Sequence, residues 1–129
     1  MNEFNKRKTG SEYETVACHY MEQLGFRTAA RNFNCRQGEI DLIGYHEGYL
    51  VFGEVKYRAS DAKGMPEDAV NRAKQIRICR SADYYRLLHG YPDDSPVRYD
   101  VIAICGKDNS RITWYKNAFP HIYAGRTSF

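Results

Sequence analysis

The chain has 129 residues, of which 43% are hydrophobic, so it should fold as one domain and is too short for two well-packed ones. Its formal net charge of +3 permits a nucleic-acid partner without requiring one. No apolar run approaches the length of a membrane-spanning helix, and the N-terminal MNEFNKRKTG lacks the apolar stretch of a signal peptide. We therefore expect a cytoplasmic protein without membrane association.

The first third of the chain predicts an arm, a helix and a strand. Residues 1–8 are polar and basic, and we expect them to form a flexible N-terminal arm. A helix should follow from Thr9, because Tyr13 and the apolar residues after it, as far as Leu24, recur at helical spacing. Residues 26–33 then predict the first strand.

The next segment, GEIDLIGYHEGYLVFGEVKYR, predicts two β-rich runs around a turn near His46. If the turn consists of the two residues Glu47 and Gly48, the register can be counted outward from it. That register places Asp41 directly opposite Glu54, whereas a three-residue turn would offset the pair by one position.

The second half of the chain predicts one helix and two more strands. Its elements in order are a polar loop over residues 59–65, a helix from Pro66 to about His89, a strand over 97–105 (VRYDVIAIC), a strand over 111–115 (RITWY) and a frayed C-terminus over 122–129. The resulting order, α-β-β-β-α-β-β, predicts an α/β domain over residues 9–121 with a central mixed β-sheet flanked by helices.

Asp41 and Glu54 are the candidates for chemistry. Opposed strand residues have Cβ atoms about 5 Å apart on one face. Two carboxylates at that distance repel each other unless a cation lies between them. Lys56 projects from the same face as Glu54, and oxygen ligands beside an ammonium group suit Mg²⁺ or Mn²⁺ and a phosphate substrate. The alternative interpretation is a solvated set of strand residues, but both carboxylates interrupt apolar runs.

GEIDLI followed by FGEVKYR resembles the PD-(D/E)xK motif of restriction-endonuclease-like proteins and Holliday-junction resolvases. The chain is most similar to the YraN-like family of small bacterial proteins in that superfamily. The similarity runs over about residues 9–119, through TGSEYETVA, RNFN, GEIDLI, FGEVKYR, PEDAVNRAKQIRI, RYDVIAI and ITWYKNAF. The resemblance implies a restriction-endonuclease-like fold and a divalent-metal site, and it leaves the substrate open.

The resemblance also implies a Glu on the first helix, in the setting G-x-x-x-E-x-x-A, which matches Gly10, Glu14 and Ala17. A helical wheel places Glu14 at one edge of the apolar stripe and Glu12 at the other, so the wheel does not choose between them. The resemblance favours Glu14. A solvated Glu near the helix N-terminus is the alternative.

These residues have distinct expected roles. Asp41 and Glu54 would bind the metal ion, with the carbonyl group of Val55 as a further ligand and Glu14 binding directly or through water. Lys56 would orient or help to deprotonate the attacking water and stabilise charge on the phosphate. Glu39 shares the face of Asp41 and would either support it from outside the ligand set or have only a structural role.

Basic residues around this set are candidates for nucleic-acid contacts. Arg58 follows the motif on the Lys56 face, and Arg36 lies in the loop before GEID. Lys74 and Arg77 belong to a basic stripe on the long helix, which would track a nucleic-acid backbone or form a solvated face. Asp100 is unexpected in an apolar strand; ordering Arg98 or a motif residue would explain it.

Two functions follow as expectations. The first is a Mg²⁺- or Mn²⁺-dependent endonuclease that hydrolyses phosphodiester bonds of DNA, including branched or structured DNA. The alternative is a nucleic-acid-binding module that keeps the fold and the metal site but cuts poorly or not at all. DNA is the expected partner, and a homodimer stays open beside a monomer.

Overall fold

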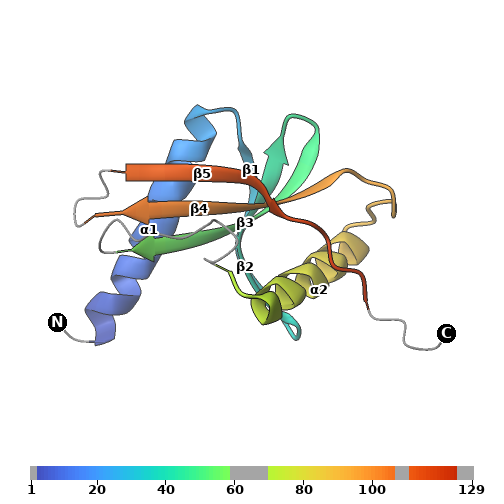
Figure 1. Cartoon of the computed structure of the whole chain (residues 1–129), viewed down its shortest axis with the longest axis horizontal. Helices are drawn as coiled ribbons and strands as arrows, with labels where there is room; N and C mark the ends of the chain where they lie inside the picture. Colours follow the sequence, from blue (N-terminus) through green and yellow to red (C-terminus); the bar gives the residue numbers. More distant parts are fainter. Residues whose placement is uncertain (1–2, 59–69, 107–110, 125–129) are drawn as a thin grey trace.

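A computed structural model describes residues 3–58, 70–106 and 111–124 of the chain (Figure 1). Their order is α-β-β-β-α-β-β, which confirms the prediction. The elements are α1 (Glu3–Gln23), β1 (Arg27–Cys35), β2 (Gly38–His46), β3 (Tyr49–Arg58), α2 (Arg72–Leu88), β4 (Val97–Cys105) and β5 (Arg111–Phe119).

The strands form one mixed sheet in the order β1-β2-β3-β4-β5. β3 and β4 pair in parallel, and the other neighbours pair antiparallel. The connection between β3 and β4 carries α2, as a parallel pair requires. The two helices pack against different clusters of buried side chains, so the sheet lies between them (Figure 1). This arrangement is consistent with a restriction-endonuclease-like fold.

The core has one cluster on each side of the sheet. Met21 of α1 packs against Leu42 and Ile102 in the first cluster. Tyr85 of α2 joins Phe52 and Tyr99 in the second. Alternation along a strand sends neighbouring residues to opposite faces, which is why β3 and β4 supply both clusters. No helix in the part of the chain that the structure describes is long and apolar enough to span a bilayer.

The β2–β3 hairpin has the register counted from the sequence. His46 pairs with Tyr49, and the ladder runs inward to Leu42 and Gly53. Glu47 and Gly48 have φ angles of 53° and 85°, and positive φ at both central residues is typical of a type I′ turn. Because the turn holds two residues, the face of every side chain that follows is fixed.

The ladder between β2 and β3 ends at Leu42 and Gly53, before the pairing of Asp41 with Glu54 is reached. The pairing of β3 with β4 continues as far as Arg58. β2 therefore leaves the edge of β3 at Asp41, while it stays paired with β1. The resulting opening in the sheet places Asp41 and Glu54 on strands that have separated.

The helix bounds differ from those predicted. α1 begins at Glu3 rather than near Thr9, since residues 3–8 contain no proline and continue the helix. The described part of α2 begins at Arg72, because the Asn71 side chain accepts a 2.9 Å hydrogen bond from the Lys74 N–H and caps the helix. The predicted loop over 59–65, the helix start at Pro66 and the C-terminal residues 125–129 lie outside the described residues.

Asp100 belongs to a buried hydrogen-bond network. It accepts hydrogen bonds from Arg98 Nε (3.0 Å), Trp114 Nε1 (2.8 Å) and the Asn117 N–H (2.9 Å). Arg98 also lies 2.9 Å from His46 Nδ1. This network fixes the end of the sheet near the hairpin turn. Of the two roles expected for Asp100, the structure confirms the ordering of Arg98.

Candidate active site

Asp41 bridges the opening between β2 and β3. Its Oδ2 atom accepts a 2.9 Å hydrogen bond from the Val55 N–H. If the pairing of β2 with β3 continued, the backbone of β2 would accept this hydrogen bond instead. In an antiparallel strand the carbonyl group of a residue projects to the same side as its N–H, so the Val55 carbonyl also faces the opening. The hydrogen bond orients the Asp41 carboxylate at the mouth of the opening.

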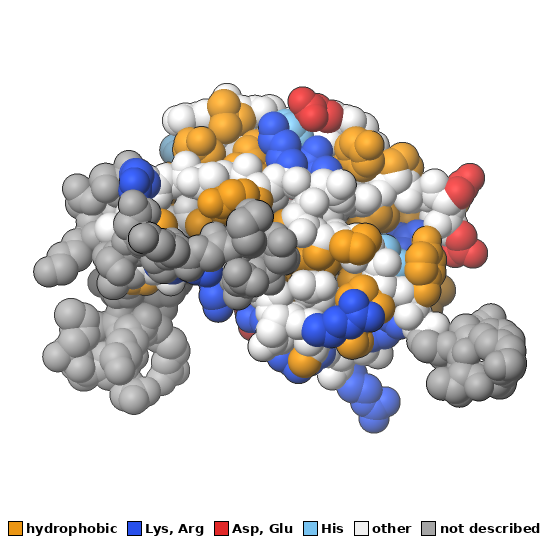
Figure 2. Space-filling model, in the orientation of Figure 1, with side chains coloured by type: hydrophobic (Ala, Val, Ile, Leu, Met, Phe, Trp, Pro, Cys, Tyr) orange, Lys and Arg blue, Asp and Glu red, His pale blue; other side chains and the backbone are white. Residues whose placement is uncertain are grey.

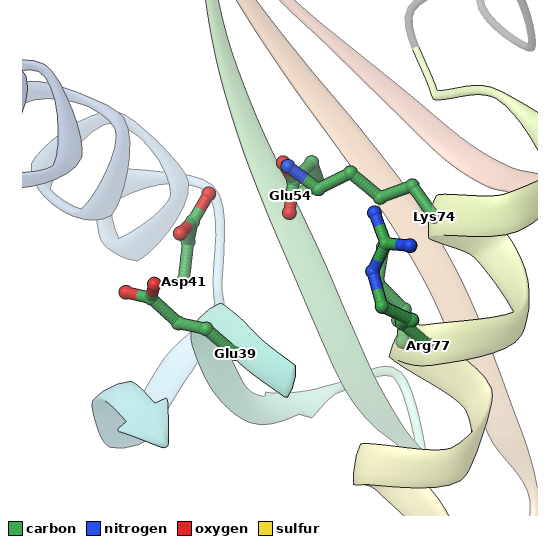
Figure 3. Close-up of a pocket in the computed structure, with 6 residues that line it drawn as sticks. Glu39, Asp41, Glu54, Lys74 and Arg77 are labelled. Carbon is green, nitrogen blue, oxygen red and sulfur yellow. The ribbon is translucent and has the colours of Figure 1, made fainter. Parts of the chain in front are cut away.

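Glu54 is buried and paired with a cation. Its residue exposure is 5%, and its Oε2 atom lies 2.7 Å from Lys74 Nζ (Figure 3). Burial disfavours the charged ammonium, but the hydrogen bond and attraction from Glu54 outweigh that effect and raise the pKa of Lys74. Lys74 thus points into the site from α2, which differs from the second of the two alternatives that the sequence left open for it, a contact with a nucleic-acid backbone or a solvated face.

The face of α2 explains this difference. Ala73 and Ile76 of α2 are exposed, although both are apolar. The buried residues are Ile78, Cys79, Ser81, Ala82 and Tyr85. This orientation of α2 turns Lys74 toward the sheet and leaves Arg77 exposed at the edge of the site.

Three carboxylates gather beside the opening. Glu14, Glu39 and Asp41 each offer an oxygen atom, and these atoms lie within 4.8 Å of one another. Figure 3 shows the Glu39 and Asp41 side chains of β2 beside each other. Glu12 is exposed and lies outside this group, so the structure places Glu14, and not Glu12, near Asp41.

Burial and mutual repulsion disfavour charge on this cluster. Burial raises the pKa of Asp41 to about 7, and repulsion from Glu54, Glu14 and Glu39 acts in the same direction. The hydrogen bond from the Val55 N–H opposes the shift. Burial also raises the pKa of Glu14, with Glu39 and Glu54 contributing. Such a cluster favours either protons or a bound cation.

The donor set fits a small divalent ion. Mg²⁺ binds oxygen atoms at about 2.1 Å, so opposite ligands lie roughly 4.2 Å apart, close to the spacing of the cluster. All the side-chain donors are carboxylate oxygens, the ligand type that Mg²⁺ and Mn²⁺ prefer. The cluster of Glu14, Glu39 and Asp41 could therefore bind a metal ion.

Two cavities meet at Asp41, Glu54 and Lys74. The smaller cavity, of about 190 Å³, is also lined by Glu39, Arg77 and Ile78 (Figure 3). The larger cavity, of about 330 Å³, is also lined by Tyr13, Glu14, Val55, Lys56 and Tyr57. Lys56 thus lines the same space as Asp41 and Glu54.

Comparison with known proteins identifies the family. Residues 13–104 match the model of the uncharacterised protein family UPF0102. The chain belongs to this family. It is 44% identical over 115 residues to a UPF0102 protein of Lachnoclostridium phytofermentans, covering 89% of this chain and 95% of that protein. It is 46% identical over 114 residues to one of Marinobacter nauticus, covering 87% and 92%.

The match to UPF0102 includes the whole candidate site, from Tyr13 to Ile78. A third relative, from Nitrosococcus oceani, is 40% identical over 116 residues, covering 88% of this chain and 92% of that protein. The names of these relatives give the family and no activity. Family membership therefore confirms the resemblance seen in the sequence, while the chemistry of the site has to be argued from its residues.

The structure separates the predicted contact residues of this UPF0102 protein into two groups. Lys74 lines both cavities, and Arg77 lines the smaller one. Arg58, at the end of β3, and Arg36, in the turn between β1 and β2, line neither of the two.

Sequence reasoning missed two features of the site. Glu39 was expected to support Asp41 from outside, but its carboxylate lies in the same cluster. Tyr13 and Tyr57, which line the larger cavity, were not singled out. Their positions in the sequence could have indicated them, because Tyr13 directly precedes Glu14 and Tyr57 directly follows Lys56.

Proposed function

We propose that this protein is a divalent-metal-dependent endonuclease that hydrolyses phosphodiester bonds of DNA, with branched or structured DNA among its substrates. The observation that carries the proposal is the shared lining of the larger cavity. Asp41, Glu54 and Lys56, together with Glu14 from α1, surround one space although they come from three separate elements. Carboxylates and an ammonium group around one cavity suit a metal ion and a phosphate.

The carboxylates would hold the ion. Asp41 and Glu54 are the proposed ligands, with Glu14 and the Val55 carbonyl completing the set and Glu39 close enough to contribute. When bound, Mg²⁺ or Mn²⁺ offsets negative charge on the phosphate and lowers the pKa of water. The Val55 N–H keeps the Asp41 carboxylate in one orientation, which reduces the reorganisation needed on binding.

Lys56 has a different role, because an ammonium group cannot bind a metal ion. It lines the cavity beside Glu54 and would orient the attacking water and stabilise the charge that develops on the phosphate. Lys74 would contact the phosphate from the opposite side, once a cation has taken over the neutralisation of Glu54. Both lysines line the larger cavity.

One observation favours the alternative, a nucleic-acid-binding module with little or no catalytic activity. Lys74 Nζ lies 2.7 Å from Glu54 and so already neutralises one of the proposed ligands. The basic residues of α2 could then bind only the nucleic-acid backbone. Figure 2 shows several Lys and Arg side chains in the region where Figure 1 draws α2, and below it. In that case the ion would be weakly held.

Cleavage of three DNA substrates tests the proposal. Linear duplex, single-stranded and four-way-junction DNA would be incubated with the parent protein, in Mg²⁺ and in Mn²⁺. We expect metal-dependent cleavage of at least one substrate, and its loss in Asp41→Asn and Lys56→Ala. Asp94→Asn, at an exposed Asp that lines neither cavity, is the matched control and should cleave as the parent does. Metal binding without cleavage of any substrate would instead support the binding module.

A further inference from the structure

Two tyrosines form a stacked pair at the wall of the larger cavity. The rings of Tyr13 on α1 and Tyr57 on β3 have centroids 4.1 Å apart and planes inclined by 7°. Both side chains are half-buried, at the edge of the core cluster beneath α1. Parallel stacking is an ordinary geometry of aromatic pairs, and it is also the geometry that a nucleobase adopts on an aromatic ring.

The cavity reaches this pair around the open edge of β3. Lys56 and Tyr57 are consecutive, so their side chains project from opposite faces of the strand. They line one cavity because β2 has left the edge of β3 beyond Gly53, which opens a passage from one face to the other. The residues that line this one space thus include carboxylates, lysines and two aromatic rings.

We propose that the Tyr13–Tyr57 pair stacks an unpaired nucleobase, so that the substrate class is nucleic acid with an unpaired nucleotide at the site. This inference rests on the proposed function, because the carboxylates and Lys56 locate the phosphate to which that base belongs. A volume of about 330 Å³ suits one nucleotide, since small-ligand cavities begin at roughly 300 Å³.

Base pairing decides the substrate class. A base inside a duplex is stacked on both faces and reaches a protein ring after it has been unpaired or displaced, at a cost of a few kcal/mol. A single strand, a frayed end or the unpaired part of a branch presents its base without that cost. Stacking on a tyrosine pair is tolerant of base identity, because every base has a π-face.

Binding of a labelled oligonucleotide in Ca²⁺ tests this inference without cleavage. The probes are a short single strand of dT, a strand of the same length that lacks bases, and a duplex. We expect the parent to bind the dT strand roughly 5- to 150-fold more tightly than the abasic strand, the range expected for stacking one base. Tyr57→Leu should abolish that ratio, whereas Tyr57→Phe should keep it because the ring remains.

Tyr20→Leu is the matched control, since Tyr20 lies on α1, is also half-buried, and lines neither cavity. It should keep the ratio. Equal affinity of the parent for dT and abasic strands would overturn the inference, as would equal losses in Tyr57→Phe and Tyr57→Leu. If Tyr57→Leu does not fold, the comparison of the two strands with the parent still decides.

The two proposals fail in different ways. Metal-dependent cleavage by a parent protein that binds the dT and abasic strands equally would refute the stacking site but not the endonuclease. Base-dependent binding without cleavage of any substrate would refute the endonuclease and leave the stacking site standing.

Discussion

Neutralising Asp41 should stabilise the metal-free protein at high pH. Asn is nearly isosteric with Asp, and its carbonyl oxygen can still accept the hydrogen bond from the Val55 N–H. The substitution removes the charge that Glu54 and the neighbouring carboxylates repel. We therefore expect Asp41→Asn to be more stable than the parent in a chelator at about pH 8.5, although it should bind metal less well.

The magnitude follows from the pKa of Asp41. Its value of about 7 in the folded protein is about 3 units above the value of roughly 3.9 expected in the unfolded chain. At about 1.4 kcal/mol per unit, the parent should lose at most about 4 kcal/mol of stability from this group. Below about pH 4 the group is protonated in both states, so the loss accumulates between about pH 4 and pH 7 and is complete above.

Urea denaturation in a chelator, at a series of pH values, measures this effect. The difference in free energy of unfolding between Asp41→Asn and the parent should grow by about 2–4 kcal/mol between about pH 4.5 and 8.5. Asp94→Asn, at an exposed position, should show no such growth. A constant difference across the pH range would refute the repulsion that we infer.

Metal titration completes this test. Mn²⁺ at about 100 times its dissociation constant should stabilise the parent by about 2.7 kcal/mol. Asp41→Asn should gain much less from the same addition. If both proteins gain equally, Asp41 is not a ligand.

Three further predictions concern the cations of the site. Lys56→Ala should leave Mn²⁺ affinity in calorimetry close to the parent value but reduce cleavage about 100-fold or more, and cleavage at the parent rate would remove its catalytic role. Lys74→Ala should reduce the free energy of unfolding of the metal-free protein by about 1–3 kcal/mol, because it leaves the buried Glu54 carboxylate without its partner. It should also raise the affinity for Mn²⁺. If neither value changes, the Lys74–Glu54 ion pair contributes nothing to stability or to metal binding. Arg77→Glu should weaken DNA binding and reduce the dependence of the binding constant on salt. The melting temperature should not fall, since Arg77 is exposed. An unchanged salt dependence would show that Arg77 does not contact the DNA backbone.

Local sequence signals predicted much of the fold. The order of elements follows from hydrophobic periodicity, and the strand Val97–Cys105 has the bounds predicted for VRYDVIAIC. The two-residue turn at Glu47 and Gly48 set the hairpin register. Alternation along β3 then placed Glu54 and Lys56 on one face. Each of these results depends on residues close together in the sequence, where hydrogen bonding and side-chain alternation act over short range.

Tertiary packing decided the composition of the site. The separation of β2 from β3 beyond Leu42 turned a predicted cross-strand pair into an opening bridged by Asp41. The docking of α2 rotated Lys74 onto Glu54, and the docking of α1 brought Glu14 to Asp41 and Tyr13 to Tyr57. These contacts join elements distant in sequence. Their geometry depends on how whole faces pack together, so neither the motif nor its spacing could determine it.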